Sequence, residues 1–88
     1  MKWQDVRNQY ADRWVLVEAL KANSIDNKRV IQDMSVISNH TNSTSAWKEY
    51  KSLHLSNPSR ELYIFYTSNE EIEVIEQRFM GVRRRSLQ

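Results

Sequence analysis

The chain has no cysteine in its 88 residues, so neither a disulfide nor a thiolate–metal site can stabilise it. A chain of this length forms one domain, residues 1–88, and a domain of this size buries roughly 60–68% of its unfolded surface. Its core must come from side-chain packing alone. Three Trp, four Tyr and two Phe supply it, because each aromatic side chain buries about 150–250 Å² when enclosed.

Composition also limits where the protein acts. A hydrophobic content of 40% and a net charge of only +2 argue against disorder. The beginning of the chain carries Lys2 and Asp5 without an apolar run behind them, unlike a signal peptide. Apolar runs such as Trp14–Val17 are far shorter than a membrane span. Together with the missing cysteines, these features predict a cytoplasmic protein without a membrane partner.

The first half of the chain reads as a short helix followed by a hairpin. Residues 5–12 repeat apolar side chains at helical spacing. Residues 14–20 are rich in β-favouring types and predict a buried strand, and residues 29–38 predict a second one. The polar residues 23–27 between them predict a turn. We expect the two strands to pair through a rather long loop.

The second half begins with the main helix, predicted over residues 46–56. Its apolar stripe includes Trp47, Tyr50 and Leu53, and Ser43 or Thr44 in the polar linker is suited to cap it. Residues 61–67 predict a strand with apolar side chains on both faces, which is typical of a central strand.

Residues 69–80 allow two interpretations. Residues 68–71 resemble a capping box, followed by apolar residues at helical spacing. The same segment also alternates as a strand, and a hairpin with the preceding strand would be the simplest connection. We favour the strand. The predicted fold is therefore α+β: a single small antiparallel or mixed sheet of three to four strands, one main helix and a short N-terminal helix.

Signatures of catalysis and of cofactor or metal binding are missing from the sequence. His40 and His54 lack the spacing of metal ligands, and a single glycine leaves no phosphate-binding loop or nucleophile elbow. A weaker option is hydrolytic or metal chemistry around His54 and the glutamates of residues 70–76. The sequence predicts a protein that is not an enzyme and holds no cofactor.

The C-terminal arginines offer a second kind of function. Positive side chains in this tail could contact phosphates, which makes nucleic-acid binding the alternative to protein interaction. The preceding glutamates would repel a nucleic-acid backbone. The residues of this alternative site are Arg78, Arg83, Arg84 and Arg85.

The leading prediction is a protein-interaction domain. In the strand of residues 61–67, Tyr63 and Phe65 face one side and Tyr66 the other. A sheet face without a helix over it would expose an apolar patch, and such patches usually bind a partner. A homo-oligomer is the simplest form, with another protein as the second possibility. We predict Tyr63, Phe65 and Tyr66 as interface residues, and Trp47 and Tyr50 as support or core.

A pattern spread along the chain consists of Trp3, Val6, Arg7, Tyr10, Trp14–Ala19, Tyr50, Leu53, His54, Glu61–Tyr63, Thr67–Ser68 and Gly81–Arg83. This pattern resembles a group of small uncharacterised bacterial proteins, some of which are encoded beside retropepsin-like aspartic proteases. The resemblance implies a compact bacterial domain with a partner encoded nearby, and it assigns no functional residue. The chain departs from the pattern at Ala11, where proline is frequent, and at Tyr66, where histidine is frequent.

Overall fold

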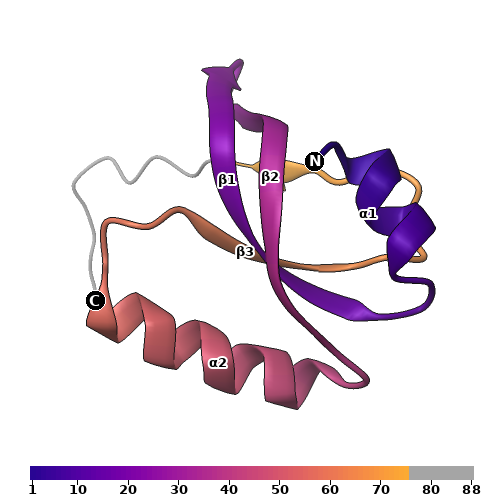
Figure 1. Ribbon diagram of the computed structural model, residues 1–88. Coiled ribbons are helices and arrows are strands. Elements are labelled where there is room, and N and C mark those ends of the chain that lie inside the picture. Colours follow the sequence, from indigo (N-terminus) through magenta and orange to yellow (C-terminus); the bar gives the residue numbers. More distant parts are fainter. Residues whose placement is uncertain (76–88) are drawn as a thin grey trace, which may run out of the picture.

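The computed structural model describes residues 1–75 and forms one four-stranded antiparallel sheet with two helices (Figure 1). The strand order is β3-β1-β2-β4. This arrangement confirms the predicted α+β class, with a short N-terminal helix and one main helix. The elements in chain order are α1 (Trp3–Gln9), β1 (Trp14–Ile25), β2 (Lys28–His40), α2 (Ser43–Ser56), β3 (Leu62–Tyr66) and β4 (Val74–Ile75).

The two longest strands, β1 and β2, form a hairpin with a two-residue turn. The turn residues Asp26 and Asn27 have φ values of 49° and 66°, the left-handed geometry that a type I′ turn requires. Asp and Asn tolerate this geometry better than other residues that carry a Cβ. The expected long loop was therefore wrong, because the strands continue through the polar residues up to the turn.

The hairpin is irregular in its register. Shifts occur between Leu16 and Val17, and on either side of Lys21. Irregularities of this kind increase the local twist of a strand pair. In Figure 1 the hairpin accordingly twists along its length, and its turn projects at the top, away from both helices.

The core on one face of the sheet lies beneath α1. Val6 of the helix is fully buried against Val15 and Val17 of β1 and Met34 of β2. The alternation of Val15 and Val17 is the period of two that a strand with one face in this core requires. α1 is thus held to the sheet by a compact apolar cluster.

Helix α2 covers part of the other face and connects β2 to β3. Both strands run antiparallel to β1, which lies between them, so β2 and β3 are parallel to each other. Leu16 and Leu62 are buried outside the α1 cluster, together with Ala46 of α2. The helix is capped by Asn42, whose side chain accepts from the Ser45 amide at 2.9 Å, rather than by Ser43 or Thr44. Among residues 1–75 no helix is long and apolar enough to cross a membrane.

The two short strands, β3 and β4, lie at opposite edges of the sheet. The central position predicted for β3 was wrong, because β1 occupies that place. The apolar side chains on both faces of β3 have another cause: Tyr63 and Phe65 pack on the α1 core, and Leu62 is buried outside it. The predicted strand within residues 69–80 is confirmed for Val74–Ile75, and residues 76–80 lie outside the described part. β4 pairs with Lys28 and Arg29 of β2, not with β3 as expected.

Candidate protein-interaction surface

Strand β3 places its aromatic side chains on both faces of the sheet. Tyr63 and Phe65 lie on the α1 side, where their rings stack at 5.8 Å and Phe65 meets Trp3 edge-on at 5.5 Å. Tyr66 lies on the opposite side, with its ring 5.0 Å from that of Trp14. All three predicted interface residues are half-buried. All three stand at the edge of the sheet, and no other strand within residues 1–75 lies on the outer side of β3.

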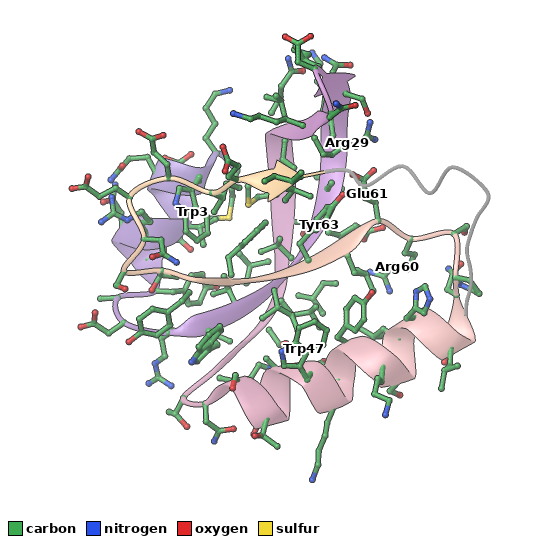
Figure 2. All side chains as sticks on the ribbon, turned by 180° about the vertical axis from the view of Figure 1, so that it is seen from behind. Trp3, Arg29, Trp47, Arg60, Glu61 and Tyr63 are labelled. Atoms are coloured by element: carbon green, nitrogen blue, oxygen red, sulfur yellow. The ribbon has the colours of Figure 1, made fainter. Side chains whose placement is uncertain are left out.

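An ion-pair network crosses the sheet at the beginning of β3 (Figure 2). Arg29 of β2 donates from two nitrogens to the two carboxylate oxygens of Glu61, each at 2.8 Å. The Tyr63 hydroxyl donates to the same carboxylate at 2.6 Å. This two-point geometry is the strongest form of such a pair. Arg29 reaches across β1, which carries only the small side chains of Ala22 and Ser24 beside it.

This network changes the pKa of each member. The hydrogen bond from Arg29 lowers the pKa of Glu61, and the same bond raises the pKa of Arg29. Burial, followed by the hydrogen bond to Glu61, raises the pKa of Tyr63 to about 12. A general acid or base needs a pKa near the pH at which it works. These pKa values lie away from neutral pH on both sides, and the network fixes the position of β3.

A second ion pair holds the same end of β3. Arg60 donates to Glu18 of β1 at 2.8 Å, and this hydrogen bond lowers the pKa of the Glu18 carboxyl. Arg60 and Glu61 are consecutive, and their partners come from different strands. The segment that leads into β3 is thus anchored by two ion pairs, one on each residue.

The far end of the hairpin carries an uncovered set of apolar side chains, which we call the distal row: Ile25, Val30 and Ile75. Ile25 and Ile75 both pair with Lys28, so the three residues share one face across β1, β2 and β4. Ile31 packs into the α1 core, so Val30 beside it lies on the opposite face. The side chains of the distal row are 54%, 41% and 63% exposed. Helix α2 lies on this face only at the other end of the hairpin (Figure 1).

Ser38, His40 and Glu49 form a polar cluster where β2 leads into α2. His40 Nε2 lies 3.0 Å from both Ser38 Oγ and Glu49 Oε1, and the Ser38 hydroxyl also donates to Glu49. In a nucleophilic triad the serine and the acid contact opposite nitrogens of the ring. Here both contact one nitrogen, which differs from that arrangement, and the cluster ties β2 to α2. His40, which we expected in a loop, is the last residue of β2.

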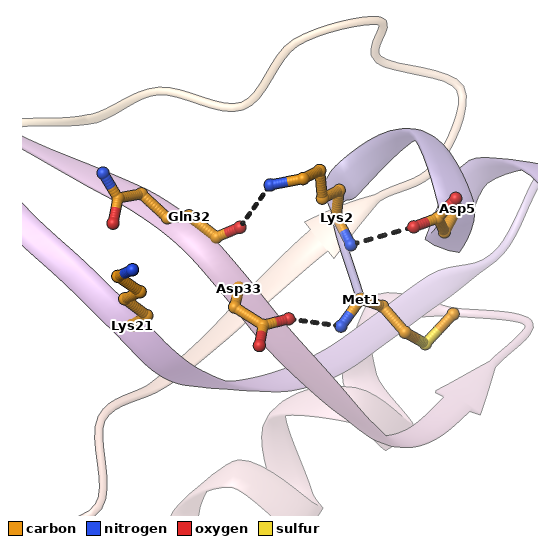
Figure 3. Close-up of a pocket in the computed structure, with 6 residues that line it drawn as sticks. All are labelled: Met1, Lys2, Asp5, Lys21, Gln32 and Asp33. Carbon is orange, nitrogen blue, oxygen red and sulfur yellow. Dashed lines mark hydrogen bonds and ion pairs between the residues drawn. The ribbon is translucent and has the colours of Figure 1, made fainter.

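A groove of about 560 Å³ lies between the beginning of α1 and the hairpin (Figure 3). The Met1 ammonium forms an ion pair with Asp33 at 2.5 Å, the backbone amide of Lys2 donates to Asp5 at 3.1 Å, and the Lys2 ammonium donates to the Gln32 carbonyl at 3.5 Å. The ammonium lowers the pKa of Asp33. Gln32 and Lys21 complete the lining. The groove presents charges of both signs, and its lining is mostly polar.

The aromatic residues predicted on the main helix divide between core and surface. Tyr50 is half-buried, with its ring stacked at 5.7 Å on His54. Trp47 lies 5.2 Å from Tyr50 and keeps 52% of its surface exposed. Tyr50 therefore supports the packing of α2, which is one of the two roles predicted for it (support or core). Trp47 lies at the surface.

The structure describes the residues of the other two options only in part, because Glu76 and the four arginines lie beyond residue 75. Arg78, Arg83, Arg84 and Arg85 are outside the described residues, so nucleic-acid binding stays a prediction. Glu70, Glu71 and Glu73 are exposed, and Glu73 pairs with Lys28 at 3.0 Å. Within residues 1–75 no group of three or more His, Asp or Glu side chains could hold a metal ion.

No family model, no curated protein and no solved structure matches this chain. The resemblance to small bacterial proteins therefore stays a prediction. What the protein does has to be argued from its own geometry.

Sequence reasoning missed the polar contacts that fix the candidate surface. Thr67 is buried, and its hydroxyl accepts from the Arg13 amide at 2.9 Å. Arg29 and Glu61 pair across the sheet, although they lie far apart in the chain. A sequence signal existed, because each of these two charges directly precedes apolar strand residues. Charges in such places are usually paired.

Proposed function

We propose that this chain is a protein-interaction domain and not an enzyme, and that the distal row binds a protein partner. The observation that carries the proposal is the exposure of Ile25, Val30 and Ile75 on one face of three neighbouring strands. Apolar side chains gathered on one face are typical of a binding surface, whereas single exposed ones are ordinary.

The surroundings of the distal row support this proposal. Lys28 lies between Ile25 and Ile75, and its aliphatic stem adds apolar surface while Glu73 neutralises its charge. An apolar centre with a polar border is the usual anatomy of a protein interface. β-Branched side chains on a paired sheet also lose little conformational freedom when a partner covers them. The partner, as the resemblance implies, is a bacterial protein encoded nearby, and the proposed location is the cytoplasm.

A binding experiment with matched variants tests the proposal. The chain is immobilised, and the proteins it retains are identified by mass spectrometry. The most strongly retained protein is then purified, and its affinity for the chain is measured by titration calorimetry. We expect the double variant Ile25→Lys/Val30→Lys to bind that protein at least about tenfold more weakly, because each buried apolar contact contributes on the order of 1 kcal/mol or more. Leu55→Lys is the control, since Leu55 is 78% exposed on α2, away from the row.

The variants must keep their fold for this comparison, which circular dichroism and thermal melting establish. Equal affinity of the wild type and the double variant for the purified protein would overturn the proposed site. A loss of binding in Leu55→Lys, with the double variant unaffected, would place the partner on α2 instead.

A further inference from the structure

Strand β3 exposes backbone groups along its outer edge. The Ala19 amide donates to the Glu61 carbonyl and the Thr67 amide donates to the Arg13 carbonyl, both at 2.9 Å, so odd-numbered residues of this strand bond to β1. Neighbouring residues in a strand point their backbone groups in opposite directions. The groups of Leu62, Ile64 and Tyr66 therefore point away from the sheet. Among residues 1–75 only the Tyr66 carbonyl has a further backbone partner there, the Asn69 amide at 3.2 Å.

This edge lacks the protection that isolated edges usually have. Lysine, proline and bulges are the common devices that keep an edge strand from pairing with another chain. β3 has none of them, and its register with β1 is uninterrupted over all five residues. The other open stretches differ: β1 shows register shifts on either side of Lys21, β2 is covered by β4 and by Met1, which exchanges backbone hydrogen bonds with Met34, and the edge strand β4 is only two residues long.

We propose that two copies of this chain pair through the outer edges of their β3 strands, antiparallel and across a two-fold axis at Ile64, so that their sheets join. The proposal deepens the interaction role by naming a partner, and it rests on a surface other than the distal row. A two-fold axis makes each copy present the same edge to the other. With the axis at this residue, the outward amides and carbonyls form about six backbone hydrogen bonds between the copies, two of which use the second lone pair of the Tyr66 carbonyls that already accept from Asn69.

The side chains suit this register. Ile64 meets its own copy, Tyr63 meets Phe65 of the second copy, and Leu62 meets Tyr66 of the second copy. Aromatic pairs and aromatic–aliphatic pairs across strands are favourable contacts. No like charges oppose each other, because the flanking residue Glu61 meets a threonine and the residue before it meets a serine. The pairing would cover the open sides of the half-buried rings.

The expected dimer is weak, because an edge of five residues buries less than about 1,200 Å² in total. Sedimentation equilibrium from roughly 10 µM to roughly 1 mM covers the affinities of such interfaces. We expect the wild type to change from monomer to dimer within this range. A monomer throughout the range would overturn the proposal.

Two substitutions at one position isolate the outward backbone group. Ile64→Pro removes the side chain and the outward amide, and an edge strand tolerates proline when the lost amide faces away from the sheet. Ile64→Ala removes most of the side chain but keeps the amide. We expect the proline variant to stay monomeric where the alanine variant still forms dimers. Equal dimerisation of two folded variants would overturn the edge geometry.

A distance measurement keeps the test decisive even if Ile64→Pro does not fold. The chain has no cysteine, so Ser68→Cys gives one site for a spin label on an exposed residue. The proposed register places the two labelled backbone positions at most about 27 Å apart, at about 3.4 Å per residue over eight residues, because Ser68 lies in the turn that follows β3. Moving the axis by one residue changes this distance by about 7 Å. A distance from pulsed electron paramagnetic resonance that does not match the spacing expected for an axis at Ile64 would overturn the register.

The same measurements separate this proposal from the partner site on the distal row. Ile25→Lys/Val30→Lys leaves β3 unchanged and should dimerise as the wild type does. If this double variant loses the dimer while Ile64→Pro keeps it, the two copies associate through the distal row and the edge proposal is wrong.

Discussion

The hydroxyl of Thr67 offers the sharpest test of how β3 is held in the fold. Thr67 is only 3% exposed and makes three hydrogen bonds to segments distant in sequence. Its hydroxyl accepts from the Arg13 amide and its amide donates to the Arg13 carbonyl, both at 2.9 Å, while its carbonyl accepts from Arg7 Nε at 3.0 Å. One residue thus joins α1, the beginning of β1 and the end of β3.

Thr67→Val removes the hydroxyl at nearly constant volume and leaves the Arg13 amide without its acceptor. An unsatisfied buried group costs about 1–3 kcal/mol, and this part-buried amide belongs in the lower half, about 1–2 kcal/mol. The whole domain is stable by about 4–13 kcal/mol at typical values per residue. We therefore expect the melting temperature to fall by roughly 4–16 °C.

Thr67→Ser is the matched control, because it keeps the acceptor and loses one methyl group, a change of about 0.5–1.5 kcal/mol. Urea denaturation measures the free energy of unfolding of both variants. Amide hydrogen exchange at Arg13 separates their mechanisms: protection should be lost with valine and kept with serine. Undiminished protection of this amide in Thr67→Val would refute the reasoning.

Three further outcomes follow from the charges and the turn. The pKa of Glu61 is lowered below its ordinary 4.5, so its contribution to stability is present above that value and lost as the pH falls through the folded pKa. In acid unfolding, the free energy of unfolding of Glu61→Gln should therefore depend less steeply on pH than that of the wild type. The raised pKa of Tyr63, about 12, makes stability fall as the pH rises from 10 to 12, and Tyr63→Phe should remove this loss in alkaline denaturation. Asn27→Val should cost about 1–2 kcal/mol in urea denaturation, whereas Asn27→Gly should cost nothing, because only the branched residue opposes a φ of 66°.

The elements with strong local patterns could be predicted from the sequence. The stripe of Tyr50 and Leu53 and the β-favouring run at Trp14–Val17 fixed the type of α2 and β1 without knowledge of their neighbours. Both elements were predicted too short. The N-cap Asn42 lies before the apolar stripe begins, and β1 continues into polar residues because pairing with β2, and not burial, holds its distal half. Apolar periodicity reports burial, so it misses strand length that depends on hydrogen bonds alone.

The candidate surface could be predicted only in part. Alternation along β3 correctly separated Tyr63 and Phe65 from Tyr66, because that depends on the period of the strand alone. The distal row could not be found, since Ile25, Val30 and Ile75 meet only through the register of three strands. Periodicity within one segment carries no information about which residue of another strand lies beside it.

The order of the strands explains why β3 lies at an edge despite its apolar faces. Because the turn at Asp26 and Asn27 is tight, β1 and β2 pair with each other as a hairpin, and one side of β1 stays open for another strand. Helix α2 reverses the chain after β2, so β3 returns parallel to β2 and takes the open side of β1. The next segment, Thr67–Ile75, leads to β4 at the far edge, and the outer side of β3 receives no strand from residues 1–75. Within residues 1–75, β3 thus combines apolar side chains on both faces, no charge inside the strand and one unpaired side, which is why we propose a second copy as its partner: pairing would add backbone bonds and cover its rings at once.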